Sequence, residues 1–215
     1  MHGNDIYKTK EWKKIRELSR AQLLLVVEGL KRGTIIDGDT QGFDEVIQQA
    51  GLTARLNSAP GSKRRVVRVA TREDLDRYDE LSTAPTNDIN DFHKINAWFL
   101  GYPDCCLEEY IAPRTGEQAQ AKEKREHGMT YTFGQEIIAI RVEGGEYHPS
   151  FNYRPPSFTP CSTKCDTAIN LLHSWKEALE TNDPKAAAAL VGFNIMNAPK
   201  TRKEQAAMLK GWRKQ

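Results

Sequence analysis

Four cysteines carry the most evident chemistry of this sequence. They form two pairs, Cys105–Cys106 and Cys161–Cys165, and the chain has no other cysteine. Each pair follows a proline, Pro103 or Pro160, and each stands where a helical pattern begins. At a helix start the unpaired backbone N–H groups and the positive end of the helix dipole favour thiolate over thiol. If the two helix starts face each other, we expect the four sulfurs to meet as ligands of one metal centre.

Three kinds of site fit this arrangement: an iron–sulfur cluster, a structural zinc with four sulfur ligands, and a metal-free thiol site with Cys105 or Cys106 as nucleophile. Zinc modules and thiol–disulfide enzymes usually contain Cys-x-x-Cys, which this chain lacks. Adjacent helical residues point about 100° apart, which suits separate irons better than one small ion. We therefore rank the cluster first, zinc second and free thiols third. Buried inert cysteines are the remaining alternative, which two pairs at helix starts disfavour.

Each alternative implies a different function. An iron–sulfur cluster predicts a component that transfers electrons or binds a substrate. A zinc ion predicts a module that binds nucleic acid or protein. Free thiols predict a redox enzyme. The sequence leaves open whether the chain is an enzyme, and it identifies no substrate.

The sequence around the two cysteine pairs resembles that of a known family. Leu100 to Cys106 reads Leu-Gly-Tyr-Pro-Asp-Cys-Cys, and Pro160 to Cys165 reads Pro-Cys-Ser-Thr-Lys-Cys. Both are similar to the signature of a largely archaeal prokaryotic family, domain of unknown function 483, over about residues 88–180. The family brings no activity with it. The resemblance implies that Cys105, Cys106, Cys161 and Cys165 form one unit, and that the N-terminal part is a variable attachment.

Three histidines are further candidates for the site, as a ligand, an outer-shell partner or a proton donor. His93 lies on the amphipathic segment before the first pair, His148 precedes Pro149 in a proline-rich loop, and His173 follows Cys165 by eight residues. Each of them taken singly is more typical of a surface or core position. The aromatic residues expected to shield such a site from water, or to pack the core, are Tyr102, Tyr153 and Phe158.

The fold expected to position these residues is α+β, mostly helical with a small sheet. Helical patterns cover 9–31, 43–50, 88–100, 104–112, 116–127 and 163–180; a further helix is expected to begin at Thr71, and two more follow from Asp183 onward. Strands are predicted at 34–36, 66–70 and 136–143, the last being a nearly continuous apolar run typical of a central strand. Gly33 is expected to end the first helix in a left-handed conformation. We divide the chain into a helical and mixed region, 1–84, and a four-cysteine domain with C-terminal helices, 85–215.

The charge distribution bears on partners and location. The net charge is +2, but residues 8–20 and 200–214 are basic whereas residues 73–91 are acidic. Basic N- and C-terminal helices predict solvated faces or, alternatively, a surface for nucleic acid or an acidic protein. Apolar runs such as Leu23–Val27 are too short for a membrane span. No secretory signal follows Met1, which predicts a cytoplasmic, reducing location where cysteines more often bind metals than form disulfides.

Overall fold

The fold predicted from the sequence, α+β and mostly helical with a small sheet, is confirmed. The computed structural model describes residues 3–37, 43–56, 66–84, 89–111 and 136–198. A helical segment also covers residues 136–142. The other elements, in chain order, are the 3-10 helix η1 (Gly3–Lys8), α1 (Lys10–Lys14), α2 (Glu17–Val27), β1 (Gly33–Asp37), α3 (Phe43–Gln49), β2 (Thr53–Leu56), β3 (Val66–Ala70), α4 (Arg72–Thr83), α5 (Ile89–Leu100), α6 (Asp104–Ile111), the 3-10 helix η3 (Pro149–Tyr153), α8 (Asp166–Asn182) and α9 (Pro184–Met196).

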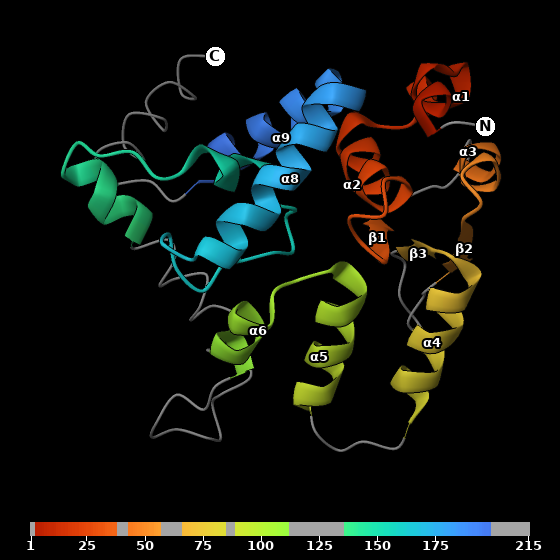
Figure 1. Cartoon of the computed structure of the whole chain (residues 1–215), viewed down its shortest axis with the longest axis horizontal. Coiled ribbons are helices and arrows are strands. Elements are labelled where there is room, and N and C mark those ends of the chain that lie inside the picture. Colours follow the sequence, from red (N-terminus) through yellow and green to blue (C-terminus); the bar gives the residue numbers. More distant parts are fainter. Residues whose placement is uncertain (1–2, 38–42, 57–65, 85–88, 112–135, 199–215) are drawn as a thin grey trace, which may run out of the picture.

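The three strands form one antiparallel sheet with the order β1-β3-β2. Arg68 of β3 stands opposite Ile35 of β1 on one side and Arg55 of β2 on the other. Helices cover both faces, with α2 above the sheet and α4 and α5 below it in the view of Figure 1. Four of the five residues of β3 are therefore buried. The short edge strand β2 was not predicted.

Two hydrophobic clusters make up the core. The larger one surrounds α2, α8 and α9 and includes the fully buried Trp12, Phe151 and Trp175. The smaller one centres on Phe99, between α5, α4 and the end of β3. The larger cluster contains residues from both sides of position 84, and the predicted division into two regions there stays a prediction.

The predicted strand at 136–143 is wrong, because residues 136–142 are helical. Only Ile137 of the apolar run is buried, and Val142 is 71% exposed, so no central strand exists here. The two following glycines explain the difference. Gly144 has φ +76°, and the Gly145 N–H bonds the Ile140 carbonyl, which together form a left-handed helix cap. The Gly-Gly pair ends a helix instead of joining two strands.

The first predicted helix is two helices, α1 and α2, with extended backbone at Ile15 between them. The buried Arg20 donates to the Ile15 carbonyl at 3.0 Å, so this carbonyl bonds a guanidinium in place of a helical amide. Gly33 is not the helix cap. Gly29, with φ +69°, follows α2, whereas Gly33 begins β1 beside the Phe99 ring.

The predicted boundaries at three other helices are confirmed. Thr71 caps α4 by accepting from the Asp74 N–H, and Gly101, with φ +71°, follows α5. Asp183 caps α9 with Pro184 in its first turn. The predicted helices at 116–127 and 200–214 lie outside the described residues.

Candidate metal centre

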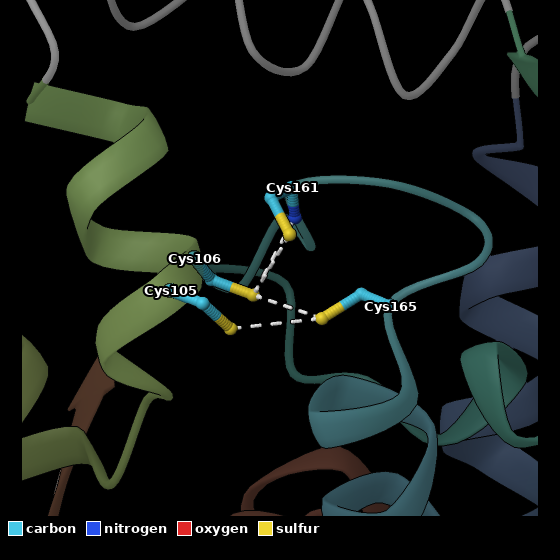
Figure 2. A group of neighbouring side chains, drawn as sticks. All are labelled: Cys105, Cys106, Cys161 and Cys165. Carbon is cyan, nitrogen blue, oxygen red and sulfur yellow. Dashed lines mark hydrogen bonds between the residues drawn. The ribbon is translucent and has the colours of Figure 1, made fainter.

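The structure brings the four predicted cysteines together. Cys105 and Cys106 lie in the first turn of α6, Cys161 lies in the turn before α8, and Cys165 stands at the start of α8 (Figure 2). All four side chains point toward a common centre. The two segments are separated by more than fifty positions in the chain, so this convergence is a property of the fold and not of local sequence.

The sulfur atoms lie at ligand spacing. Sγ of Cys105 is 3.7 Å from Sγ of Cys165, while Sγ of Cys106 is 3.8 Å from that of Cys161 and 3.9 Å from that of Cys165. All four lie within 4.8 Å of one another. All four cysteines are free thiols. A set of four soft donors at these separations suits a thiophilic metal, so this group could hold a metal ion.

The local structure around the second pair differs from the prediction. Cys165 itself caps α8, because its sulfur accepts the Ala168 N–H at 3.4 Å. Cys161 is not on a helix and precedes this cap by four residues. Its backbone N–H points at the sulfur of Cys106, at 3.5 Å. The prediction that both pairs occupy a first helical turn therefore holds for Cys105 and Cys106 only.

Glu136 fixes the turn that carries Cys161 and Cys165, a role that the sequence did not reveal. Its Oε2 accepts from the Thr163 N–H at 2.7 Å, from the Thr163 hydroxyl at 2.8 Å and from the Ser162 hydroxyl at 3.3 Å. Thr163 is 7% exposed, so this carboxylate bonds a buried backbone group. The Ser162 hydroxyl in turn accepts the Lys164 N–H. The segment 161–165 is thereby held from both sides.

The protonation of the thiols reflects their surroundings. Burial is the main cause that raises the pKa of Cys106, and it raises the pKa of Cys161 to about 11. At Cys165 burial also acts upward, but the Ala168 N–H and the neighbouring thiols lower its pKa overall. At Cys165 the helix-start N–H and the neighbouring thiols together outweigh burial, whereas burial prevails at Cys106 and Cys161. A bound cation is what compensates several thiolates held at one point.

None of the three candidate histidines belongs to the sulfur group. His93 stacks edge-on against Tyr110 with ring centroids 4.8 Å apart. His148 caps η3 by accepting the Ser150 N–H, and His173 lies 3.3 Å from Glu177 on the exposed side of α8. Of the three, His93 is the histidine that lines the same pocket as Cys106.

Two of the three aromatic residues proposed to shield the site lie beside it. Tyr102 and Phe158 stack with centroids 4.7 Å apart, and both line the same pocket as Cys106. The hydroxyl of Tyr153 instead bonds Glu180 of α8. Of the three, Tyr102 and Phe158 are therefore the residues that lie on the Cys106 side of the sulfur group.

The basic segment 8–20 is partly neutralised within the fold. Lys8 pairs with Asp5, Lys14 with Glu11, and Arg20 with the buried carboxylate of Asp183. The basic segment 200–214 lies outside the described residues. A nucleic-acid or acidic protein partner stays a prediction.

Comparison with known proteins adds no relative. No protein-family profile, no curated protein and no solved structure matches this chain. The resemblance to domain of unknown function 483 therefore stays a prediction. Among the described helices, none has the length and apolarity needed to cross a membrane.

Proposed function

We propose that this chain is a metal-binding protein in which Cys105, Cys106, Cys161 and Cys165 hold a single zinc ion. One observation carries the proposal: the spacing of the four sulfurs. Ligands about 2.3 Å from a tetrahedral ion stand about 3.8 Å apart, and three of the sulfur–sulfur distances are 3.7, 3.8 and 3.9 Å. An iron–sulfur cluster spreads its four cysteines over two or four irons, so that sulfurs on different irons stand roughly 6 Å apart.

The upper limit of 4.8 Å across the group favours the single ion over the cluster that the sequence ranked first. Adjacent helical residues point about 100° apart, but this does not prevent Cys105 and Cys106 from binding one ion. Rotation about the Cα–Cβ bonds turns the sulfurs of Cys105 and Cys106 toward the same point (Figure 2).

The role proposed for the ion is structural. Four thiolates complete a tetrahedral zinc site, which leaves no open position for water or substrate. The ion would join the start of α6 to the turn before α8. Because zinc in such sites contributes directly to folding free energy, removing it is expected to loosen these two segments first.

An anaerobic metal titration tests the proposal. The reduced, metal-free chain should bind one cobalt(II) with the intense sulfur-to-cobalt absorption of a four-thiolate site, and zinc should displace the cobalt. Single Cys→Ser variants at the four positions should each weaken this absorption. Iron with acid-labile sulfide in a brown, anaerobically purified protein would favour the cluster instead, and absence of any tight metal would favour the free-thiol alternative.

A further inference from the structure

A pocket adjoins the sulfur group on the side of Cys106. It has a volume of about 280 Å³ and lies between α5, α6 and the turn around Ser157 and Phe158. Cys106 is only 2% exposed, yet its side chain forms part of the pocket wall. Any molecule that reaches the centre from this side therefore does so through the pocket.

The walls of the pocket are mostly aromatic. His93 of α5 and Tyr110 of α6 form one ring pair, and Tyr102 and Phe158 form another. Phe92, which is 48% exposed, also lines the pocket. Rings of this kind favour flat ligands that stack or pack edge to face.

Three polar side chains of the pocket, those of Tyr102, Ser157 and Asn96, are hydrogen-bonded within the protein. The hydroxyls of Tyr102 and Ser157 bond one another. The Asn96 side chain accepts from Tyr78 and donates to the Phe92 carbonyl. Among the described lining residues there is no Asp, Glu, Lys or Arg. A carboxylate ligand would lose its hydration here without gaining a Lys or Arg partner.

The pocket volume sets the size of the ligand. An apolar cavity of about 150 Å³ accommodates one benzene ring, so about 280 Å³ suits roughly two rings. We propose that this pocket binds a small, uncharged molecule of about two fused rings, held against the Cys106 side of the metal centre. The inference rests on the proposed function, because it places the ligand beside the metal.

The probe for this proposal is 5-fluoroindole, titrated into the zinc-loaded chain and followed by fluorine NMR. We expect saturable binding, with the charged analogue indole-3-acetate at least about tenfold weaker. Leu107→Trp adds a large side chain at a partly exposed lining residue of α6 and should weaken binding about tenfold or more. Phe92→Ala removes an exposed ring of the wall and should weaken it severalfold.

Two matched variants and a metal exchange complete the test. Leu56→Trp and Ile195→Ala change exposed apolar residues elsewhere, 61% and 51% exposed, and should leave binding unchanged. Replacing zinc by cobalt(II) should broaden the fluorine signal of the bound probe, because the ring lies beside the metal. No saturable binding, equal binding of the charged analogue, insensitivity to Leu107→Trp, or no broadening by cobalt would each overturn the proposal.

The outcomes separate this proposal from the proposed function. A chain that binds zinc but not 5-fluoroindole retains the metal site and loses the pocket proposal. A chain that binds no metal contradicts the proposed function, and the pocket is then tested on the reduced, metal-free chain with Leu107→Trp and Leu56→Trp.

Discussion

Glu136 is not part of the sulfur group, but it positions the segment that carries two of its members. Its carboxylate holds the Thr163 backbone and the hydroxyls of Ser162 and Thr163, and it thereby fixes the turn between Cys161 and Cys165. Partners of this kind orient metal ligands, and their loss typically costs about 10- to 100-fold in metal affinity. The sequence does not reveal this role, because Glu136 opens a segment that is predicted as a strand.

The first prediction concerns this carboxylate. Glu136→Gln replaces the charged carboxylate by a neutral amide, whose single oxygen accepts the three bonds more weakly, so the zinc dissociation constant should rise about 10- to 100-fold. Competition with a chromophoric chelator measures it. Glu143→Gln changes an exposed carboxylate that closely follows the same helical segment and should leave the constant unchanged. Equal affinity for Glu136→Gln and wild type would show that the turn holds its geometry without Glu136.

The second prediction concerns the thiols of the metal-free chain. Mild oxidation should form two disulfides, Cys105–Cys165 and Cys106–Cys161, because these two pairs together use all four sulfurs and their sulfurs lie 3.7 and 3.8 Å apart. Peptide mapping by mass spectrometry without reduction identifies the pairs. Zinc loading should slow the reaction, since coordinated thiolates are shielded. A bond between the neighbours Cys105 and Cys106 as the main product would contradict the observed orientation of the sulfurs.

At the scale of elements, β1 and α5 approach each other closely at Gly33. A Cβ added at Gly33 would lie 2.1 Å from the Phe99 ring. Phe99 is fully buried in the smaller core cluster, so it has no room to move aside. Glycine at position 33 is therefore required by packing and not by backbone conformation.

The third prediction is that Gly33→Ala lowers the free energy of unfolding by about 1–3 kcal/mol, the usual cost of overpacking a core. Denaturant unfolding measures the change. Gly192→Ala is the matched control, because Gly192 lies inside α9 with nothing within 4 Å of the added Cβ. It should raise stability by about 0.5–1 kcal/mol through helix propensity. A neutral Gly33→Ala would mean that Phe99 can be displaced without cost.

The elements differ in how far the sequence predicts them. Thr71 and Asp183 signal helix starts through capping side chains, and these predictions hold because caps are local. The run Ile137–Ile140 contains β-branched residues that suit a strand, yet the cap at Gly144 and Gly145 makes it helical. The four cysteines were predicted as one group from their types and positions. The proposal of a single ion in place of a cluster rests on the sulfur–sulfur distances. These depend on side-chain rotation, which residue spacing in the sequence does not determine.

At the scale of the whole molecule, one buried carboxylate ties the N-terminal helices to the C-terminal ones. Asp183, the cap of α9, accepts from Trp12 Nε1 at 2.7 Å and from Arg20 Nε at 2.8 Å. It also accepts the Ala186 N–H. The Arg20 side chain is 4% exposed, so its charge depends on this partner. Removing one member of a buried pair leaves an uncompensated charge.

The fourth prediction is that Asp183→Asn lowers the free energy of unfolding by about 3–5 kcal/mol. Glu17→Gln, the control, removes the other carboxylate near Arg20, which is 55% exposed and 3.8 Å away. Its effect should stay below about 1 kcal/mol, as for exposed ion pairs. Chemical denaturation at neutral pH measures both. Similar losses in the free energy of unfolding would show that the buried contact of Asp183 stabilises the fold no more than the exposed ion pair does.

Lys31 lies where three parts of the molecule meet: the connection between α2 and β1, the connection between α5 and α6, and α8. It is 4% exposed, and its Nζ has no hydrogen-bond partner among the residues that the structure describes. The Nζ lies 6.0 Å from the Tyr102 ring and 5.5 Å from the Trp175 ring. Burial lowers the pKa of Lys31 to about 7 and raises that of Tyr102, so no phenolate faces the amine at neutral pH.

The fifth prediction follows from this lowered pKa. Between pH 7 and about 10.4, the ordinary lysine value, the unfolded chain binds a proton that the folded chain does not, so Lys31 makes stability rise with pH by up to about 1.4 kcal/mol per unit. Because other groups also titrate in this range, the effect is isolated by comparing wild type with Lys31→Met, both zinc-saturated. The free energy of unfolding of the variant should exceed that of wild type most at low pH. The two free energies should converge near pH 10. Lys94→Met, at an exposed lysine paired with Asp91, should follow the wild-type pH dependence. Parallel curves for wild type and Lys31→Met would mean that the buried amine keeps its proton in the fold, with the two aromatic rings stabilising the cation.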